Sequence, residues 1–425
     1  MEILLALVFV IGYAAITLEH PLNINKAAPA LITGVVCWTI YMLNSQDAHV
    51  VNHQLVEHLG EMSGIIFFLL GAMVIVELID AHDGFQIITD RIKTDSPRKL
   101  LWIIGFISFF LSAVLDNLTT TIVMVSLLRK IIADKQDRLF YAGIIVIAAN
   151  AGGAWSPIGD VTTTMLWIGN QVTTGAIVSK LFLPSVACLA VPLLYLNWKM
   201  KDTAPSLPPV KEIKANNTTA RERNIVFSLG VGGLLFVPIF KTVTHLPPYM
   251  GILLVLGVLW VVTELLHHKK NLDEKGRFSA AHALQKIDAA SVLFFLGILV
   301  AISALQSAGM LSKLAVWLSE TIGDQNIIVI AIGLLSAVID NVPLVAASMG
   351  MYSLEQFPTD HNFWVFLAYC AGTGGSCLII GSAAGVAAMG MERIDFFWYL
   401  KKISLLALLG YFAGVAVYFL QNQIF

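Results

Sequence analysis

Long apolar segments alternate with short polar ones along the whole 425-residue chain. Most of them reach or approach the roughly 20 residues that a helix needs to cross a bilayer. The pattern predicts an all-α polytopic membrane protein with about ten transmembrane helices, two re-entrant hairpins and two broken helices. The apolar segments fall at 2–18, 27–44, 62–80, 100–129, 140–170, 179–197, 225–240, 248–265, 289–308, 326–350, 363–391 and 396–420.

The composition supports a membrane location for most of the chain. Hydrophobic residues make up 57% of the sequence and charged residues 13%, whereas soluble proteins carry about 25% charged residues. Too little polar surface remains to cover a soluble core. The net charge of −2 provides no basic surface for nucleic acid. The first apolar segment lacks the basic start and the Ala-x-Ala end of a cleaved signal, so we expect it to be retained.

Short motifs recur in the same order in the two parts of the chain. The stretch 112–117 (SAVLDN) is repeated at 336–341 (SAVIDN), and the Gly-Gly and Ile-Gly pairs of 152–159 are repeated at 374–381. Internal repeats are a common feature of transporters. The recurrences divide the chain into three predicted parts: a first repeat at 1–198, a linker at 199–224 and a second repeat at 225–425.

Basic residues indicate which loops face the cytoplasm, because such loops are enriched in Lys and Arg. Arg98 and Lys99 directly precede the segment 100–129, and Arg129 and Lys130 lie at its C-terminal end. Both of its ends are therefore predicted to be cytoplasmic. Its second arm has about 11 residues, too few to cross a bilayer, so we predict a re-entrant hairpin at 99–130.

The second half shows the opposite charge pattern. Lys313 is the only basic residue in the flanks of 326–350, so we predict a hairpin there that enters from outside. The linker and the loop with Lys269, Lys270 and Lys275 are basic and should be cytoplasmic. The two repeats are therefore predicted to be inverted, with broken helices at 140–170 and 363–391.

Two acidic residues occur where the hairpins are predicted to turn. Asp116 and Asp340 each precede an asparagine, Asn117 and Asn341, in motifs that are otherwise alike. A carboxylate at membrane depth is costly to bury and is a functional hypothesis by default. The alternative is that each Asp only caps a half-helix, but Asn or Ser would cap as well without a charge. We predict that both aspartates contact a transported cation or proton.

Other oxygen-bearing residues accompany each Asp-Asn pair. Sodium prefers oxygen ligands, although helical threonines also bond back to backbone carbonyls. The glycines and proline of 152–159 favour an unwound stretch whose carbonyls can face an ion, and Asp160 beside it is either a ligand or an N-cap. The predicted binding residues are Asp116, Asn117, Thr119, Thr120, Thr121, Asn150, Ser156, Asp160, Thr162 and Thr163 in the first half, and Asp340, Asn341, Ser376 and Ser382 in the second. Sodium itself is assigned to Asp116, Asn117, Asn150 and Asp160.

Some acidic and histidine residues lie nearer the membrane surfaces. Glu77, about one turn inside the third apolar segment, is a candidate for a proton path, as is Glu61. Glu61 belongs to a polar cluster in the predicted external loop 45–61, which either senses pH or is simply solvated. The other members of this cluster are His49, His53, Glu57 and His58.

Several kinds of chemistry are missing from the sequence. No Lys or Arg lies deep within a predicted span, so the charges at membrane depth are acidic and suit a cation. No nucleotide-binding loop, cofactor motif or catalytic set within the spans is found, so energy should come from an ion gradient. The cysteines show no metal-ligand spacing and are interpreted as packing residues. They are Cys37, Cys188, Cys370 and Cys377.

The chain resembles the ion transporter superfamily, and within it the NhaD-type sodium/proton antiporters. The resemblance covers nearly the whole chain and is clearest at 112–121 (SAVLDNLTTT) and 150–164 (NAGGAWSPIGDVTTT). Carboxylate carriers of the superfamily have Gly-Thr-Pro-Pro-Asn where this chain has Gly-Asp-Val-Thr-Thr at 159–163, which argues against a dicarboxylate carrier. The resemblance implies exchange of sodium or lithium for protons in a bacterial inner membrane, a homodimer, and an elevator-like motion of the hairpin domain.

Our hypothesis from the sequence is alternating access without a cofactor. Sodium or lithium competes with protons for one or more of Asp116, Asp160 and Asp340, because burial favours the protonated carboxyl and a bound cation favours its release. The alternative is a sodium- or proton-coupled carrier of an anion, arsenite or a carboxylate, from the same superfamily. A channel is a further alternative. The sequence leaves open the choice between sodium, lithium and potassium. The expected partners are the lipid bilayer and a second copy, with no nucleotide or nucleic acid.

Overall fold

The apolar segments fold into helices throughout. A computed structural model describes residues 1–45, 47–89, 92, 94, 96–199, 218–268 and 276–424, and these contain no strand. The first half comprises α1 (Glu2–Thr17), α2 (Glu19–Leu22), α3 (Ala27–Asn44), α4 (Ala48–Ala81), α5 (Gln86–Thr89), α6 (Pro97–Leu115), α7 (Asn117–Ile131), α8 (Lys135–Ala154), α9 (Val161–Ile168) and α10 (Thr174–Lys199). The second half comprises α11 (Ala220–Thr244), α12 (Pro248–Leu266), α14 (Ala280–Lys286), α15 (Ala289–Ser307), α16 (Met310–Ile322), α17 (Gln325–Leu335), α18 (Asn341–Met351), α19 (Asn362–Gly374), α20 (Ala383–Glu392), α21 (Phe396–Lys402) and α22 (Ser404–Ile424).

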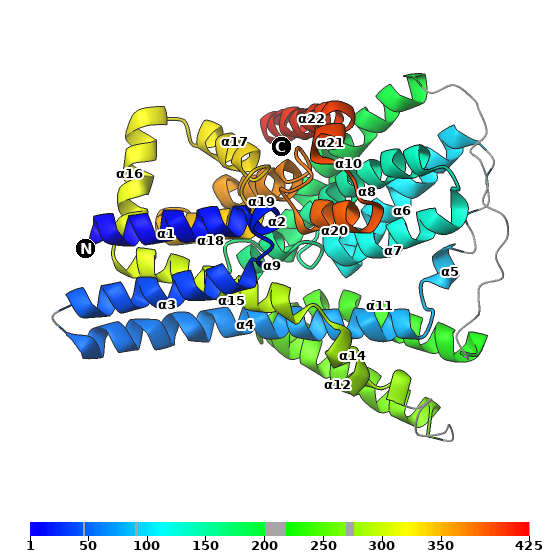
Figure 1. The fold of residues 1–425 in the computed structure, drawn as a ribbon, viewed down its shortest axis with the longest axis horizontal. Coiled ribbons are helices and arrows are strands. Elements are labelled where there is room, and N and C mark those ends of the chain that lie inside the picture. The colour runs from blue at the N-terminus through cyan, green and yellow to red at the C-terminus, as the bar shows by residue number, and fades with distance from the viewer. Residues whose placement is uncertain are drawn as a thin grey trace.

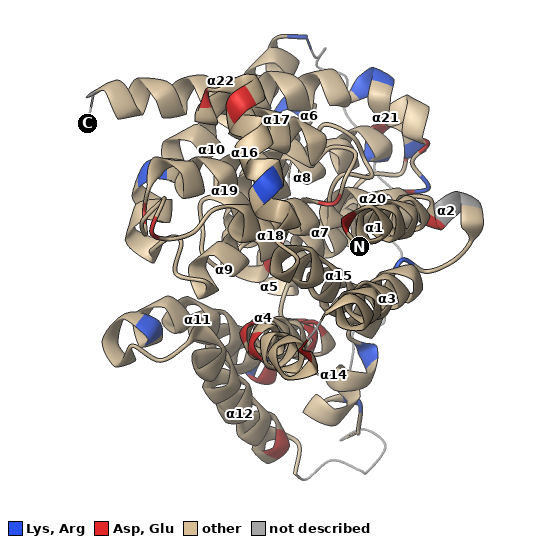
Figure 2. Ribbon diagram, turned by 90° about the vertical axis from the view of Figure 1, so that its left-hand side faces the viewer, with Lys and Arg blue, Asp and Glu red and all other residues tan. Residues whose placement is uncertain are grey.

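The helices confirm a polytopic membrane protein. Within the described ranges, eight helices are long and apolar enough to cross a membrane, or nine if the bent pair α16–α17 forms one span. Large apolar side chains on their outer faces are exposed, among them Val243 and Leu405 at 72% each. Such surface is stable against lipid chains and would be a liability in water. Figure 2 shows few charged residues along the helices.

One predicted loop is wrong. The segment 45–61 was expected to be an external loop, but α4 begins at Ala48 and continues for 34 residues. The cause is local, because the side chain of Asp47 accepts hydrogen bonds from the backbone amides of His49 and Val50 and so caps the helix. The histidines and acids of this segment therefore lie on the first turns of a helix that is about 51 Å long at 1.5 Å per residue.

The helices form two groups that share the centre of the molecule (Figure 1). In one group α3 packs on α15, and α4 packs on α12 and α15. In the other, α6 and α7 pack on α8, α17 packs on α19, and α10 packs on α22. Figure 1 shows α6 and α7 in the right-hand part of the molecule and α16 to α18 in the left-hand part. The two Asp-Asn motifs therefore belong to helices from opposite ends of the molecule.

Equivalent glycines make the same close contacts in both halves. A Cβ atom on Gly152 would collide with the carbonyl oxygen of Phe109, and one on Gly374 would collide with that of Gly333. Each contact joins a broken helix to the first arm of the neighbouring helix pair. Only glycine permits backbones to approach this closely, so the repeated motif holds the Asp-Asn turn against the broken helix.

The sidedness of these elements stays a prediction, as do the limits of the two repeats and the re-entrant form of the hairpins. Residues 200–217 of the predicted linker lie outside the described residues, as do Lys269, Lys270 and Lys275. At the base of the first helix pair, the buried carboxylate of Glu392 in α20 pairs with Arg129 and Arg138, at 2.6 and 3.2 Å. This cluster joins the end of α7 and the start of α8 to the second half.

Candidate functional site

Asp160 lies at the centre of a buried polar network between the two broken helices. Its side chain is 2% exposed. One carboxylate oxygen accepts a hydrogen bond from Asn117 at 3.2 Å, and the other accepts from Thr162 at 2.6 Å and Asn341 at 3.4 Å. Asp160 immediately precedes α9, and the hydroxyl of Thr162 in that helix donates to it. The carboxylate therefore contacts side chains of both halves as well as the start of α9.

Asn150 extends the network into the second half. Its amide oxygen accepts from Asn117 at 3.0 Å, and its amide nitrogen donates to Ser376 and Ser382 at 2.9 Å each. All four side chains are buried. The predicted residues Asn117, Asn150, Asp160, Asn341, Ser376 and Ser382 are thus brought together, although they come from four separate stretches of chain.

The first Asp-Asn turn places Asp116 at the edge of this network. The backbone of Asp116 has a φ of 85°, a strained value for a residue with a side chain. Its carboxylate oxygens accept from the backbone amide of Thr119 at 2.7 Å and from the Thr119 hydroxyl at 2.9 Å. The side chain of Asp116 therefore caps α7 and also lies beside the network, so capping and a binding role are compatible here.

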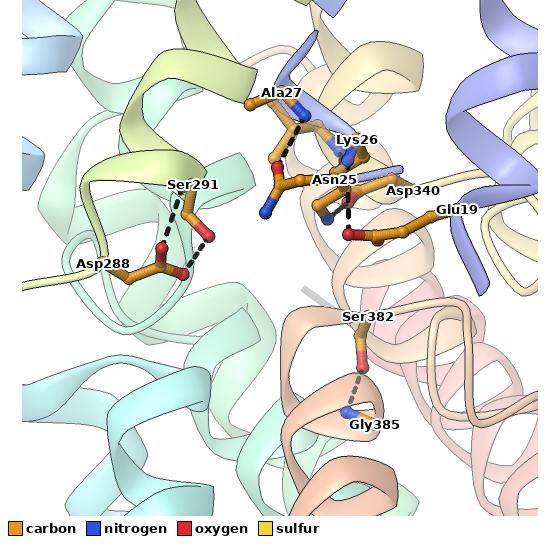
Figure 3. A network of polar contacts seen from close by, with 10 residues as sticks. Glu19, Asn25, Lys26, Ala27, Asp288, Ser291, Asp340, Ser382 and Gly385 are labelled. Carbon is orange, nitrogen blue, oxygen red and sulfur yellow. Dashed lines mark hydrogen bonds and ion pairs between the residues drawn. The ribbon is translucent and has the colours of Figure 1, made fainter. Parts of the chain in front are cut away.

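The second turn differs from the prediction. Asp340 was expected to join Asn341, Ser376 and Ser382 in a mirrored half-site, but among the described residues it forms no hydrogen bond with Asp160 or the two serines. Its Oδ2 atom pairs instead with the ammonium of Lys26 at 3.1 Å, and its Oδ1 atom accepts from the amide of Val342 at 3.2 Å. Figure 3 shows the pair between the segment before α3 and the start of α18.

The remaining predicted hydroxyls have different surroundings. Ser156 donates to the carbonyl of Ala113, and Thr121 bonds back to the carbonyl of Asn117 at 2.8 Å. The hydroxyls of Thr120 and Thr163 are buried and have no hydrogen-bond partner among the described residues. A buried hydroxyl without a partner is costly, so these two oxygens are the ones left available to a guest ion or water.

The candidates for a proton path lie away from the network. Glu77 is 3.4 Å from Lys286, and the two line a cavity of ≈ 260 Å³ that also reaches Thr119. This cavity therefore extends from the end of α4 to the partner of Asp116. Glu61 is 73% exposed and lies 3.6 Å from His58, at a separate cavity beside α9 and α15.

Oxygen atoms dominate what the centre offers to a ligand. Within the described ranges, no group of three or more His, Cys, Asp or Glu side chains is placed to hold a metal ion. A monovalent cation would instead rely on one or two carboxylates with amide, hydroxyl and backbone oxygens. These are hard oxygen ligands that suit such ions.

Lys26 is the residue that sequence reasoning missed. The segment 19–26 lies between the predicted apolar segments 2–18 and 27–44, and basic residues in such flanks were used only to predict sidedness. The signal was present, since Lys26 is the last polar residue before an apolar segment. In the structure α1 and α3 meet near the middle of the molecule (Figure 1), which places this loop beside α20.

Comparison with known proteins agrees with this architecture. A family model described as "Citrate transporter" matches residues 7–372. Sodium/proton antiporter 2 of Arabidopsis thaliana is 49% identical over 97% of this chain and 98% of its own length. Sodium/proton antiporter 1 of the same plant is 50% identical over 98% of this chain and 72% of its own length. The Na(+)/H(+) antiporter NhaD of Vibrio cholerae is 30% identical over 98% of this chain and 91% of its own length.

These likenesses define a membrane transporter of the citrate transporter superfamily type. The chain belongs to the family whose model it matches, and its resemblance to NhaD-type antiporters, first based on two short motifs, is confirmed over nearly the full length.

Proposed function

We propose that this protein exchanges sodium or lithium ions for protons across a membrane by alternating access. The observation that carries the proposal is the position of Asp160. It is a buried carboxylate that takes hydrogen bonds from both halves, and no described Lys or Arg forms an ion pair with it. A buried, unpaired carboxylate favours either a proton or a cation, so the two compete for one place.

The neighbouring groups support this competition. Asn117 donates from its amide nitrogen to both Asp160 and Asn150, and Thr163 has a buried hydroxyl without a described partner. Asp116 adds a second carboxylate at the edge. We assign sodium to the space between Asp116, Asn117, Asn150 and Asp160. The names of the relatives, which are sodium/proton antiporters in plants and bacteria, support the same exchange.

We further propose a bacterial inner membrane as the location, a dimer of two copies as the assembly, and the cavity beside Glu77 as the path to Asp116. These three points rest on the resemblance and on the position of Glu77 in the ≈ 260 Å³ cavity. Cross-linking in native membranes would show the dimer, and a monomer under those conditions would contradict it.

A carrier of anions is the second candidate. The matching family model is described as a citrate transporter, and Lys26 places one positive charge beside the second turn. Against it, the central network contains a carboxylate, which repels a carboxylate substrate. An anion carrier would be expected to place the positive charge at the centre instead.

Everted membrane vesicles separate the two candidates. The interior of the vesicles is first acidified, and a fluorescent dye that is quenched by the acid interior follows its pH. Sodium or lithium should then relieve the quenching, while potassium, choline and citrate should not. The response should disappear in Asp160→Asn and Asp116→Asn. Uptake of citrate or arsenite without any response to the cations would contradict sodium/proton exchange and leave the fold unchanged.

A further inference from the structure

Lys26 is the one described basic residue that pairs with either of the two Asp-Asn turns. Its ammonium lies 3.1 Å from Asp340 and 4.3 Å from the centre of the Phe294 ring. The side chains of Lys26 and Asp340 are 21% and 16% exposed. An ion pair this well covered is screened less by water than a surface pair, and it neutralises Asp340 from within the protein.

We propose that the ammonium of Lys26 and a transported monovalent cation compete for the carboxylate of Asp340. The inference rests on the proposed exchange function and adds a second cation position to it. An ammonium is a compact point charge that a small cation can replace. A carboxylate that holds Lys26 is already neutralised and offers little attraction to sodium, so a cation binds there only as Lys26 leaves.

The surroundings provide a place for the displaced ammonium. Lys26 lines a cavity of ≈ 420 Å³ together with Glu19, Asn25, Asp288 and Ser291. Figure 3 shows the Asp288 and Ser291 side chains on one side and the Lys26 segment on another. The flexible stem of lysine can turn toward this polar space, where water and the carboxylates of Glu19 and Asp288 would stabilise the charge.

A single residue, Asn341, connects Asp340 to the central polar network around Asp160. Asn341 follows Asp340 directly and donates to Asp160 at 3.4 Å. Lys26 lies at the start of α3, which packs on α15, whereas Asp340 lies at the start of α18. The pair therefore adds an electrostatic link to the direct packing of α18 on α15. A cation that displaces Lys26 removes this link and neutralises Asp340 at the same time.

The experiment measures binding of radioactive sodium to the purified full-length protein in detergent, at fixed pH, alongside exchange in vesicles. Lys26→Gln removes the competing charge, so the half-saturating sodium concentration should fall by about tenfold, as for one lost interaction of ordinary strength. Lys26→Arg keeps the charge and should not show the fall. Lys313→Gln is the matched control, because Lys313 forms an ion pair with Glu2 (2.7 Å) that is remote from the site.

The double variant Lys26→Gln with Asp340→Asn should lose the gain in affinity. Equal half-saturation in Lys26→Gln and Lys313→Gln, or a gain that survives Asp340→Asn, overturns the competition while leaving the exchange function standing. If no form of the protein binds sodium and none exchanges it, the proposed function fails and the inference fails with it.

A second measurement needs no variant and covers the case in which Lys26→Gln does not fold. In the native protein, sodium should raise the labelling of Lys26 by a water-soluble amine reagent, as read by mass spectrometry, relative to choline at equal ionic strength. Labelling of Lys313 serves as the internal reference. Labelling of Lys26 that is independent of sodium contradicts the displacement.

Discussion

The turns at Asp116–Asn117 and Asp340–Asn341 share a sequence motif but not an environment. Asp116 receives the backbone amide and the hydroxyl of Thr119. Asp340 receives one backbone amide and the ammonium of Lys26. Asn117 makes two hydrogen bonds in the network, at 3.0 and 3.2 Å, whereas Asn341 makes one at 3.4 Å.

The difference comes from residues just outside the motif. The position equivalent to Thr119 is Pro343, which has neither an amide hydrogen nor a hydroxyl to donate. Asp340 therefore lacks both of the donors that satisfy Asp116, and a lysine from another helix satisfies it instead. In the broken helices Asp160 is likewise replaced by Ser382. An internal repeat can thus preserve a turn while giving its two copies different electrostatic roles.

The largest effect is expected from making the two broken helices alike. Asp160→Ser gives the first half the residue that the second half has at Ser382. Exchange should fall by about 100-fold, since loss of a buried charged partner costs roughly 2–5 kcal/mol. Sodium-dependent relief of dye quenching in vesicles measures it. Activity within a factor of three of the native protein would show that Asp160 is not the shared site. Ser348→Ala provides the control, because that buried hydroxyl bonds back to the Leu344 carbonyl.

The next largest effect is expected on the stability of the protein, because different ion pairs anchor the two helix pairs. The first is tied at its base by Glu392, which pairs with Arg129 and Arg138, while the second is tied at its turn by Lys26. Glu392→Gln should lower stability by about 2–3 kcal/mol, less than a fully buried pair because Arg129 is half-exposed. Thermal melting in detergent measures it. An unchanged melting temperature would mean that the cluster contributes little.

The two asparagines provide a direct comparison of the turns. Asn117→Ala removes one donor from Asp160 and one from Asn150, and about a tenfold loss of apparent sodium affinity is expected from roughly 1–3 kcal/mol per unsatisfied buried group. Asn341→Ala removes one longer bond and should cost about threefold by the same measure. Sodium titrations of exchange at fixed pH distinguish the two. Equal losses would remove the asymmetry that we infer.

An effect smaller than that of Asn117→Ala is expected from Thr119→Val. This change deletes the hydroxyl that donates to Asp116 but keeps the backbone amide, so the turn should persist. Exchange should weaken by about three- to fivefold, as for one hydrogen bond of about 1 kcal/mol. The same sodium titration applies, with Thr121→Val as the control, because that hydroxyl bonds only to the Asn117 carbonyl. A larger loss in the control would contradict the role of Thr119.

Much of the fold followed from apolar periodicity, because helix-forming segments of sufficient length are plain in a membrane sequence. The helix pair with Asp116 and the break before Asp160 were marked by charged residues and glycines inside apolar runs. The start of α4 was missed, because His49 and its neighbours read as a polar loop although Asp47 caps a helix there. Local polarity does not distinguish a loop from a helix that projects beyond the bilayer.

The candidate site was predictable only in part. The repeated motifs placed Asn117 and Asn341 at matching turns. The structure brings both asparagines into contact with Asp160, which lies beside the first break. The partner of Asp340 was not predictable, because Lys26 is 314 positions away in the chain and reaches the turn only through the packing of α1, α3 and α15. Contacts between distant segments depend on the tertiary arrangement, which periodicity and motif spacing do not contain.

The burial of all four cysteines has a practical consequence for spectroscopy. Cys37, Cys188, Cys370 and Cys377 are each at most 4% exposed and unpaired, so water-soluble maleimides and spin labels should leave the native chain unmodified. A single cysteine introduced on α3 and another on α18 would then carry the only probes. Distances between such labels, taken with and without sodium, would report directly whether the two helices separate when the cation binds.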